Sequence, residues 1–349
     1  MIVCMRRETT PDGPIRRTVL VGALGLATAA LTGCGIRLDR DPNLPELAAD
    51  DLLRDAVARS LAAIGTDTGP AAVQDAITTF TRAVGPPWNP PEDLDEPVAP
   101  PHPDPAPMDA TAGLGDVARR VAEGLPDLGT TTSATAAVLL DVTAGALLHL
   151  DGLDADTAAE VRSALADGLT TAVQTAEEAA QSPTAEAAAG DRRTDDSQPD
   201  DGDRATGPAT DAPTPAAALV TACYAAEYAY ERAAVHLPDD DPARSGTAGR
   251  VGRLQGVVAA VGALVPDSPT PSDRPAWDLP EDPHDAETAR AAMRSAEDAV
   301  AASLLGARGS LPPAAFAAWL DDSARARSQA GGAQDLRFEV DQQTQEDAA

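Results

Sequence analysis

Three polar side chains in the C-terminal third of the chain are the first candidates for chemistry. Glu297 occupies an apolar stripe at the four-then-three spacing by which a helix presents residues to a core. Glu227 and Tyr230 lie on an earlier segment with helical periodicity. A buried carboxylate near a phenol could be a remnant metal or proton site. It could also be neutralised by Arg294 or by an arginine on a neighbouring helix, and we expect this ion pair.

A cysteine near the N-terminus suggests a different chemistry. Residues 31–34 read Leu-Thr-Gly-Cys and end an apolar run that follows a basic segment. This layout is typical of a signal peptide. A membrane-spanning helix needs about 20 residues, and the apolar run is shorter than that. The four residues resemble the lipobox of bacterial lipoproteins, which implies cleavage between Gly33 and Cys34 and a diacylglycerol on the Cys34 sulfur. A plain membrane anchor is the alternative.

The basic segment also bears on the export route. It ends in Arg16 and Arg17, a pair similar to the twin-arginine export motif, which implies export after folding. Paired arginines also occur in ordinary signal peptides, so the general secretory route stays open. We expect residues 1–33 to be a signal peptide and residues 34–44 to be a lipidated tether. The mature chain would then lie at the extracytoplasmic face of the cell membrane.

The remaining reactive residue types form no pattern that indicates catalysis. The four histidines lie on separate segments, at positions 102, 149, 236 and 284, with no pair three or four residues apart. The sequence contains no glycine-rich phosphate loop, nucleophile elbow or CxxC motif. Cys223 would be the free thiol of the mature chain, and we expect it to be buried. We therefore expect no catalytic residues, no metal and no cofactor.

Composition limits the fold and the partners. The net charge is -30 and every basic residue is an arginine, which argues against a nucleic-acid partner. Aromatic residues make up only 3% of the chain, and its apolar residues are mainly Ala, Leu and Val. Such side chains favour helices that pack closely. The composition predicts an all-α protein.

Helical periodicity in the first half of the chain predicts a helical region over residues 45–181. Its expected helices lie at about 53–64, 73–84, 114–125, 134–150 and 157–173. Residues 85–110 are rich in proline, which excludes helix interiors and predicts an extended insert. The stretch 134–150 is apolar on nearly all sides and contains Asp141. Because a membrane span would place this carboxylate in hydrocarbon, we expect a buried core helix.

The second half of the chain begins with a compositional break. Residues 182–213 have almost no large apolar side chains and cannot offset their ordering entropy, so they are expected to form a disordered acidic linker. Four further apolar stripes predict an antiparallel four-helix bundle over residues 214–330, and the second stripe consists of Val251, Leu254, Val258, Val261 and Val265. Residues 331–349 are expected to be a flexible tail. The sequence does not indicate whether the two helical regions dock.

Short motifs in the second half resemble a known family. They are Tyr-Ala-Tyr at 228–230, His-Leu at 236–237, Trp-Asp-Leu-Pro at 277–280 and Ala-Arg-Ala-Ala-Met-Arg-Ser-Ala-Glu at 289–297. Together they are similar to the ferritin-like domain of unknown function carried by actinobacterial lipoproteins. The resemblance covers residues 214–330 and implies an antiparallel four-helix bundle.

The resemblance does not extend to the residues of a di-iron site. Such sites need a Glu from each of two helices and a Glu-x-x-His from each of two others. Here Cys223 stands where an acidic residue is expected, and Glu227 and Glu297 each lack the histidine three residues later. The second helix offers Gln255 and neither a histidine nor a carboxylate.

Taken together, these patterns predict a non-enzymatic lipoprotein, a helical scaffold or binding module of the cell envelope. Its expected partners are the membrane, through the lipid on Cys34, and an envelope protein or wall material. The alternative is a metal-dependent ferritin-like oxidoreductase or storage protein with divergent ligands. A solute-binding receptor would need a two-lobed α/β architecture, which the periodicities do not offer. The sequence does not indicate an oligomeric state.

Overall fold

The structure is a computed structural model that describes residues 47–91, 98–128, 133–181, 213–280, 282–333 and 336–338. Within these residues all regular elements are helices, so the prediction of an all-α fold is confirmed. The expected signal peptide, with Arg16 and Arg17, lies outside the described residues. So do the lipidation site Cys34, its tether and residues 182–212 of the expected linker.

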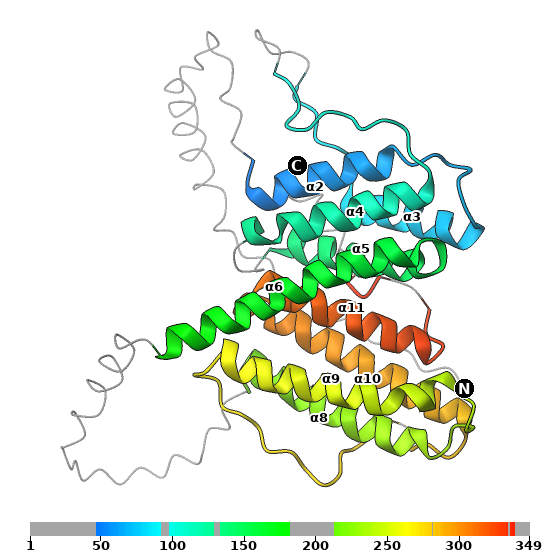
Figure 1. The fold of residues 1–349 in the computed structure, drawn as a ribbon, viewed down its shortest axis with the longest axis vertical. Helices are drawn as coiled ribbons and strands as arrows, with labels where there is room; N and C mark the ends of the chain where they lie inside the picture. The colour runs from blue at the N-terminus through cyan, green and yellow to red at the C-terminus, as the bar shows by residue number, and fades with distance from the viewer. Residues whose placement is uncertain are drawn as a thin grey trace, which may run out of the picture. The chain divides into compact units, whose positions relative to one another are not determined.

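The first group of helices matches the periodic segments before the linker (Figure 1). It consists of α2 (Ala49–Ala62), α3 (Ala71–Val84), α4 (Ala110–Gly124), α5 (Ala134–Leu153) and α6 (Ala155–Gln181), with a short 3-10 turn at Leu125–Leu128. Asp109 caps α4 by accepting a 2.8 Å hydrogen bond from Ala112 N. Ser133 caps α5 in the same way, through Ala136 N. These caps satisfy amides that the first turn leaves free.

The second group of helices follows the linker. It consists of α8 (Pro215–Ala234), α9 (Pro242–Leu264), α10 (Ala286–Ala307) and α11 (Pro313–Gln329), with a 3-10 turn at Arg308–Ser310. Proline occupies the first turn of α8, α9 and α11, where a helix does not need the missing N–H. Thr214, Asp241 and Asp285 accept amide hydrogen bonds at the starts of α8, α9 and α10. Local sequence thus sets where each helix begins.

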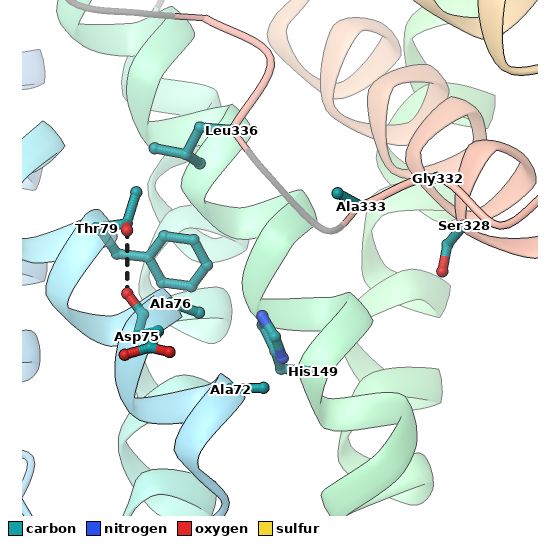
Figure 2. A pocket seen from close by; sticks show the side chains of 10 residues that line it. Ala72, Asp75, Ala76, Thr79, His149, Ser328, Gly332, Ala333 and Leu336 are labelled. Carbon is teal, nitrogen blue, oxygen red and sulfur yellow. Dashed lines mark hydrogen bonds between the residues drawn. The ribbon is translucent and has the colours of Figure 1, made fainter.

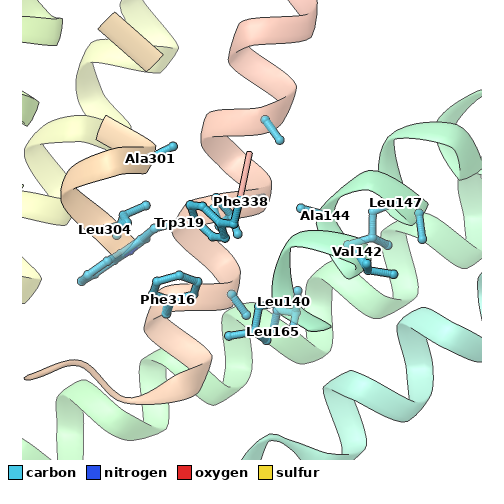
Figure 3. Packing of buried hydrophobic residues seen from close by; sticks show 14 of the residues in the cluster. Leu140, Val142, Ala144, Leu147, Leu165, Ala301, Leu304, Phe316, Trp319 and Phe338 are labelled. Atoms are coloured by element: carbon cyan, nitrogen blue, oxygen red, sulfur yellow. The ribbon is translucent and has the colours of Figure 1, made fainter. Parts of the chain in front are cut away.

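The two groups of helices share one hydrophobic core. In the second group α8 packs against α9 and α10, and α10 packs against α11, but α11 makes its main contacts with α5 and α6. Buried residues of both groups form a single cluster, and Figure 3 shows members of it from α5, α6, α10 and α11. Phe316 of α11, Leu140 of α5 and Leu165 of α6 are each at most 2% exposed. The helical regions before and after the linker therefore dock.

α5 is a core helix. By length and composition it is the one described helix that could cross a membrane, and 72% of its apolar window is buried by the rest of the protein. Its neighbours are α4, α11, α6, α3 and α2. A helix that is apolar all round needs this kind of enclosure, and here other helices provide it.

The C-terminal segment differs from the expected flexible tail. Phe338 is 7% exposed, and its ring centroid lies 6.0 Å from that of Phe316. Asp141 Oδ2 accepts hydrogen bonds from the backbone N–H groups of Arg337 (2.6 Å) and Phe338 (2.9 Å). The expectation of a flexible tail from residue 331 is therefore wrong for residues 336–338, because a buried carboxylate and a buried ring hold them on the core. Residues 339–349 lie outside the described residues.

The proline-rich insert is fixed at its two described ends by one buried ion pair on α2. Asp55 is fully buried and Arg59 is 3% exposed, and Arg59 Nε donates to Asp55 Oδ2 at 2.9 Å. Asp55 Oδ1 accepts from Trp88 N at 2.7 Å, and Arg59 Nη2 donates to Trp88 O at 2.6 Å. His102 Nδ1 lies 3.1 Å from Asp55 Oδ2. Backbone that has no helical partner is satisfied here by side chains of α2.

Candidate functional site

A charged centre lies in the interior formed by α8, α9, α10 and α11. Glu297 of α10 is fully buried, and its two carboxylate oxygens accept hydrogen bonds from Arg250 of α9. Arg250 Nε lies 2.8 Å from Glu297 Oε1, and Arg250 Nη2 lies 2.7 Å from Oε2. Tyr230 of α8 adds a third bond, from its hydroxyl to Oε1 at 2.8 Å. The carboxylate is thus held by a bidentate guanidinium and a phenol.

Arg250 also reaches the fourth helix. Its Nη1 donates to Asp322 Oδ2 of α11, so a single guanidinium that is 3% exposed bridges two carboxylates. Asp322 has two further partners near the surface, Arg253 at 2.7 Å and Arg325 at 3.3 Å. One backbone contact completes the centre, because Ser323 Oγ donates to the Glu297 carbonyl oxygen at 3.2 Å. The centre therefore ties α8, α9, α10 and α11 together.

A second chain of ion pairs runs from α11 to the first group of helices. Asp321 is 3% exposed, and its Oδ2 lies 3.0 Å from Arg162 Nε on α6 and 3.2 Å from Arg325 Nε. Arg162 Nη2 also donates to Asp151 of α5 at 2.9 Å. Burial raises the pKa of Asp321, although the nearby Arg162 and Arg325 guanidinium groups oppose this shift. Charged contacts thus join the two groups of helices beside their apolar contact.

The surroundings of the centre raise the pKa values of both Tyr230 and Arg250. Burial and the negative charge of Glu297 raise the pKa of the Tyr230 hydroxyl, so the phenol keeps its proton and donates a hydrogen bond to the carboxylate. Burial alone would lower the pKa of Arg250, but the charges of Glu297 and Asp322 outweigh it and raise this pKa. The stable arrangement is a charged arginine between carboxylates with a neutral phenol beside them.

Of the two expected partners of Glu297, the structure supplies an arginine on a neighbouring helix, Arg250, which sequence reasoning had not identified. The arginine expected on the same helix, Arg294, instead donates to the Ala330 carbonyl oxygen at 2.8 Å. The apolar stripe predicted for α9 contained Val251 and Val258, but both are only half-buried. The buried face of α9 is rotated and consists of Ala243, Thr247, Arg250, Leu254, Val257 and Val261. Arg250, Leu254 and the buried residues after them follow the spacing of one helix face, and this pattern was the signal in the sequence that could have identified Arg250.

The third expected site residue stands apart from the centre. Glu227 lies on α8 but forms no hydrogen bond with Glu297, and its Oε2 accepts from Gln255 Nε2 at 3.1 Å. Burial raises the pKa of Glu227, and the charges of Asp273 and Glu231 add to the effect. The structure therefore brings Tyr230 and Glu297 together and leaves Glu227 on a half-buried flank of α8.

Cys223 lies two turns before Tyr230 on the same helix and is fully buried. Burial raises the pKa of its thiol to about 12, with Glu297 and Glu227 contributing negative charge. A thiol with this pKa forms almost no thiolate at neutral pH and is a poor nucleophile and metal ligand. It acts as a small apolar side chain in the core.

The residues of this centre do not fit a bound metal ion. A guanidinium is not a ligand, and Arg250 already occupies both oxygens of Glu297. A cation next to Arg250 would also face its positive charge. Among the described residues, no group of three or more His, Cys, Asp or Glu side chains is placed to hold a metal.

Comparisons with protein-family models, with curated proteins and with solved structures found no match to this chain.

Proposed function

We propose that the chain is an extracytoplasmic lipoprotein, held at the membrane by lipid on Cys34, whose helices form a non-enzymatic scaffold or binding module of the cell envelope. Two lines of argument support this. The signal-peptide layout and the lipobox-like residues before Cys34 support the anchor. The closed charged centre supports a scaffold over an enzyme.

The observation that carries the scaffold role is that an arginine holds both oxygens of Glu297. Both of its oxygens accept hydrogen bonds from Arg250, and Tyr230 donates a third. A substrate or metal ion could reach the carboxylate only by displacing the guanidinium, which would leave buried charges unpaired at a high cost. The interior charges therefore serve to hold four helices in register, and any partner would bind elsewhere on the molecule.

The proposed partners follow from the anchor and the charge. The membrane is the first, through the acyl chains on Cys34. An envelope protein or a wall polymer is the second, because the helices would face that material from the membrane surface. Nucleic acid is disfavoured, since a net charge of -30 repels a polyanion. The alternative of a ferritin-like oxidoreductase or storage protein needs ligands that the surroundings of Glu297 do not supply.

The anchor is tested by labelling cells with a fatty-acid analogue. The wild-type protein should incorporate the label and partition into detergent, because stable anchoring depends on attached acyl chains. Cys34→Ala should abolish the label and leave unprocessed precursor or released protein.

The matched control is Cys223→Ser, which removes a cysteine that lies in the core and has no role in anchoring. This variant should incorporate label as the wild type does. Equal labelling of wild type and Cys34→Ala would refute the lipid anchor.

A further inference from the structure

A pocket of about 450 Å³ lies between α3, α5 and the residues that follow α11 (Figure 2). Its polar lining consists of Asp75 and Thr79 of α3, His149 of α5 and Ser328 near the end of α11. Its apolar lining is Phe80, Leu336 and small residues. The volume falls in the range of small-molecule sites, and the mixture of apolar walls with a few polar groups is typical of them.

The pocket exists because α3 and α5 approach closely at one point. The Phe80 ring lies against Gly145, where a Cβ atom would be only 2.7 Å from Phe80 Cζ. One turn further along α5, the His149 ring meets Phe80 edge-on, with centroids 6.2 Å apart and planes at 61°. Beyond this contact the small residues Ala72 and Ala76 of α3 leave space that Figure 2 shows beside His149.

His149 is the most unusual group in the pocket lining. Its side chain is 9% exposed, and its Nε2 atom has no hydrogen-bond partner among the described residues. Burial lowers its pKa, so the ring is neutral and offers one nitrogen lone pair as an acceptor. Nε2 is enclosed in this ring orientation, and a half-turn of the ring, which fills nearly the same volume, would exchange it with Cε1. A ligand that donates to the imidazole would satisfy it.

The Asp75 carboxylate faces the same space from α3. Asp75 is exposed, and its carboxylate forms no ion pair or hydrogen bond with the described residues. Figure 2 shows it on the wall opposite His149, with Ala72 and Ala76 on the same helix. No arginine or lysine among the described residues lines the pocket. The polar groups are thus a carboxylate, two hydroxyls and a neutral imidazole, which together favour a positively charged donor.

We propose that this pocket binds a small organic cation, an ammonium group on a short alkyl body. The ammonium would donate to the Asp75 carboxylate and to the His149 ring, and the alkyl part would lie against Phe80 and Leu336. The net charge of -30 would concentrate such cations near the surface and repel anions of the same size. The site is separate from the Glu297 centre and from Cys34, so the proposal holds or fails independently of the lipid anchor.

The test is a titration of the purified protein with n-butylammonium, followed by calorimetry and by the NMR signals of the His149 ring. We expect saturable binding of one cation per chain with a shift of these ring signals. Asp75→Asn should weaken binding by about three- to fivefold, because it removes the ion pair. Ala76→Leu should weaken it as well, because the larger side chain fills the pocket without changing the charge.

Two controls distinguish a specific binding site from the general attraction of cations to an acidic protein. Glu160→Gln removes an exposed carboxylate on α6 that does not line the pocket, and it should leave binding within about twofold of wild type. Butyrate, with the same alkyl chain and the opposite charge, should not bind. Unsaturable binding, butyrate binding as tight as that of the cation, or equal losses in Asp75→Asn and Glu160→Gln would each overturn the proposal.

Discussion

Replacing Arg250 with methionine should lower the free energy of unfolding by about 3–5 kcal/mol, the cost typical of removing one partner from a buried ion pair. The substitution keeps most of the side-chain volume but leaves the Glu297 carboxylate fully buried with only the Tyr230 hydroxyl as donor. Asp322 would lose one of its three arginine partners. Urea unfolding followed by circular dichroism at 222 nm would measure the change.

Arg253 provides a matched control one turn along the same helix. It pairs with the same Asp322 at 2.7 Å but is 46% exposed. Arg253→Met should therefore cost less than about 1 kcal/mol, as surface ion pairs do. Adding Glu297→Leu to Arg250→Met should recover part of the loss, because it removes the unpaired buried charge. If Arg250→Met cost no more than Arg253→Met, the centre would not hold the helices as described.

The second large effect should appear as a dependence of stability on pH that is specific to Asp141. Burial raises the pKa of Asp141 to about 7, although the N–H groups of Phe338 and Arg337 favour the charged form. Both of these donate to Oδ2, which leaves Oδ1 free to carry the proton. In the unfolded chain the same carboxyl loses its proton near pH 4.

The sign of the effect follows from these two pKa values. Between about pH 4 and pH 7 the folded protein holds a proton that the unfolded chain has lost, so the stability contributed by Asp141 falls as pH rises through this window. Above pH 7 both states are deprotonated and the contribution is constant. Asn has the shape of the protonated side chain and does not titrate, so Asp141→Asn should lack this dependence.

The measurement compares urea unfolding of wild type and Asp141→Asn at pH 5 and pH 8. Relative to the variant, the wild type should be more stable at pH 5 than at pH 8 by about 2–3 kcal/mol. Burial lowers the pKa of His149, which titrates in the opposite sense, but His149 is present in both proteins and cancels in the difference. A difference between the two proteins that does not change with pH would contradict the assignment.

The features that the sequence predicts well are those that depend on one helix at a time. Helix positions follow from periodicity, and their starts follow from proline and from capping residues such as Asp109 and Thr214. The burial of α5 follows from its uniform apolarity. The burial of Glu297 follows from its place on a stripe within a single helix.

The features that the sequence did not reveal depend on how helices meet. Arg250 lies on a face of α9 that is selected by the packing of this helix against α8, α6 and α11, and a small rotation relative to the predicted face was enough to hide it. The docking of α11 on α5 and α6 joins segments more than 150 residues apart, as the bond between Arg162 and Asp321 shows. Phe338 is buried where Asp141 accepts from its backbone N–H, although both of its neighbours in the sequence, Arg337 and Glu339, are charged.

The central claim is that an arginine closes the interior where the ferritin-like resemblance would place metals, so that the helices are a scaffold. Elemental analysis of the purified mature protein, grown with added iron and manganese and then washed with a chelator, tests it most directly. The account predicts only trace metal in the wild type, because Arg250 holds both oxygens of Glu297. Near-stoichiometric iron or manganese that resists the chelator would contradict it.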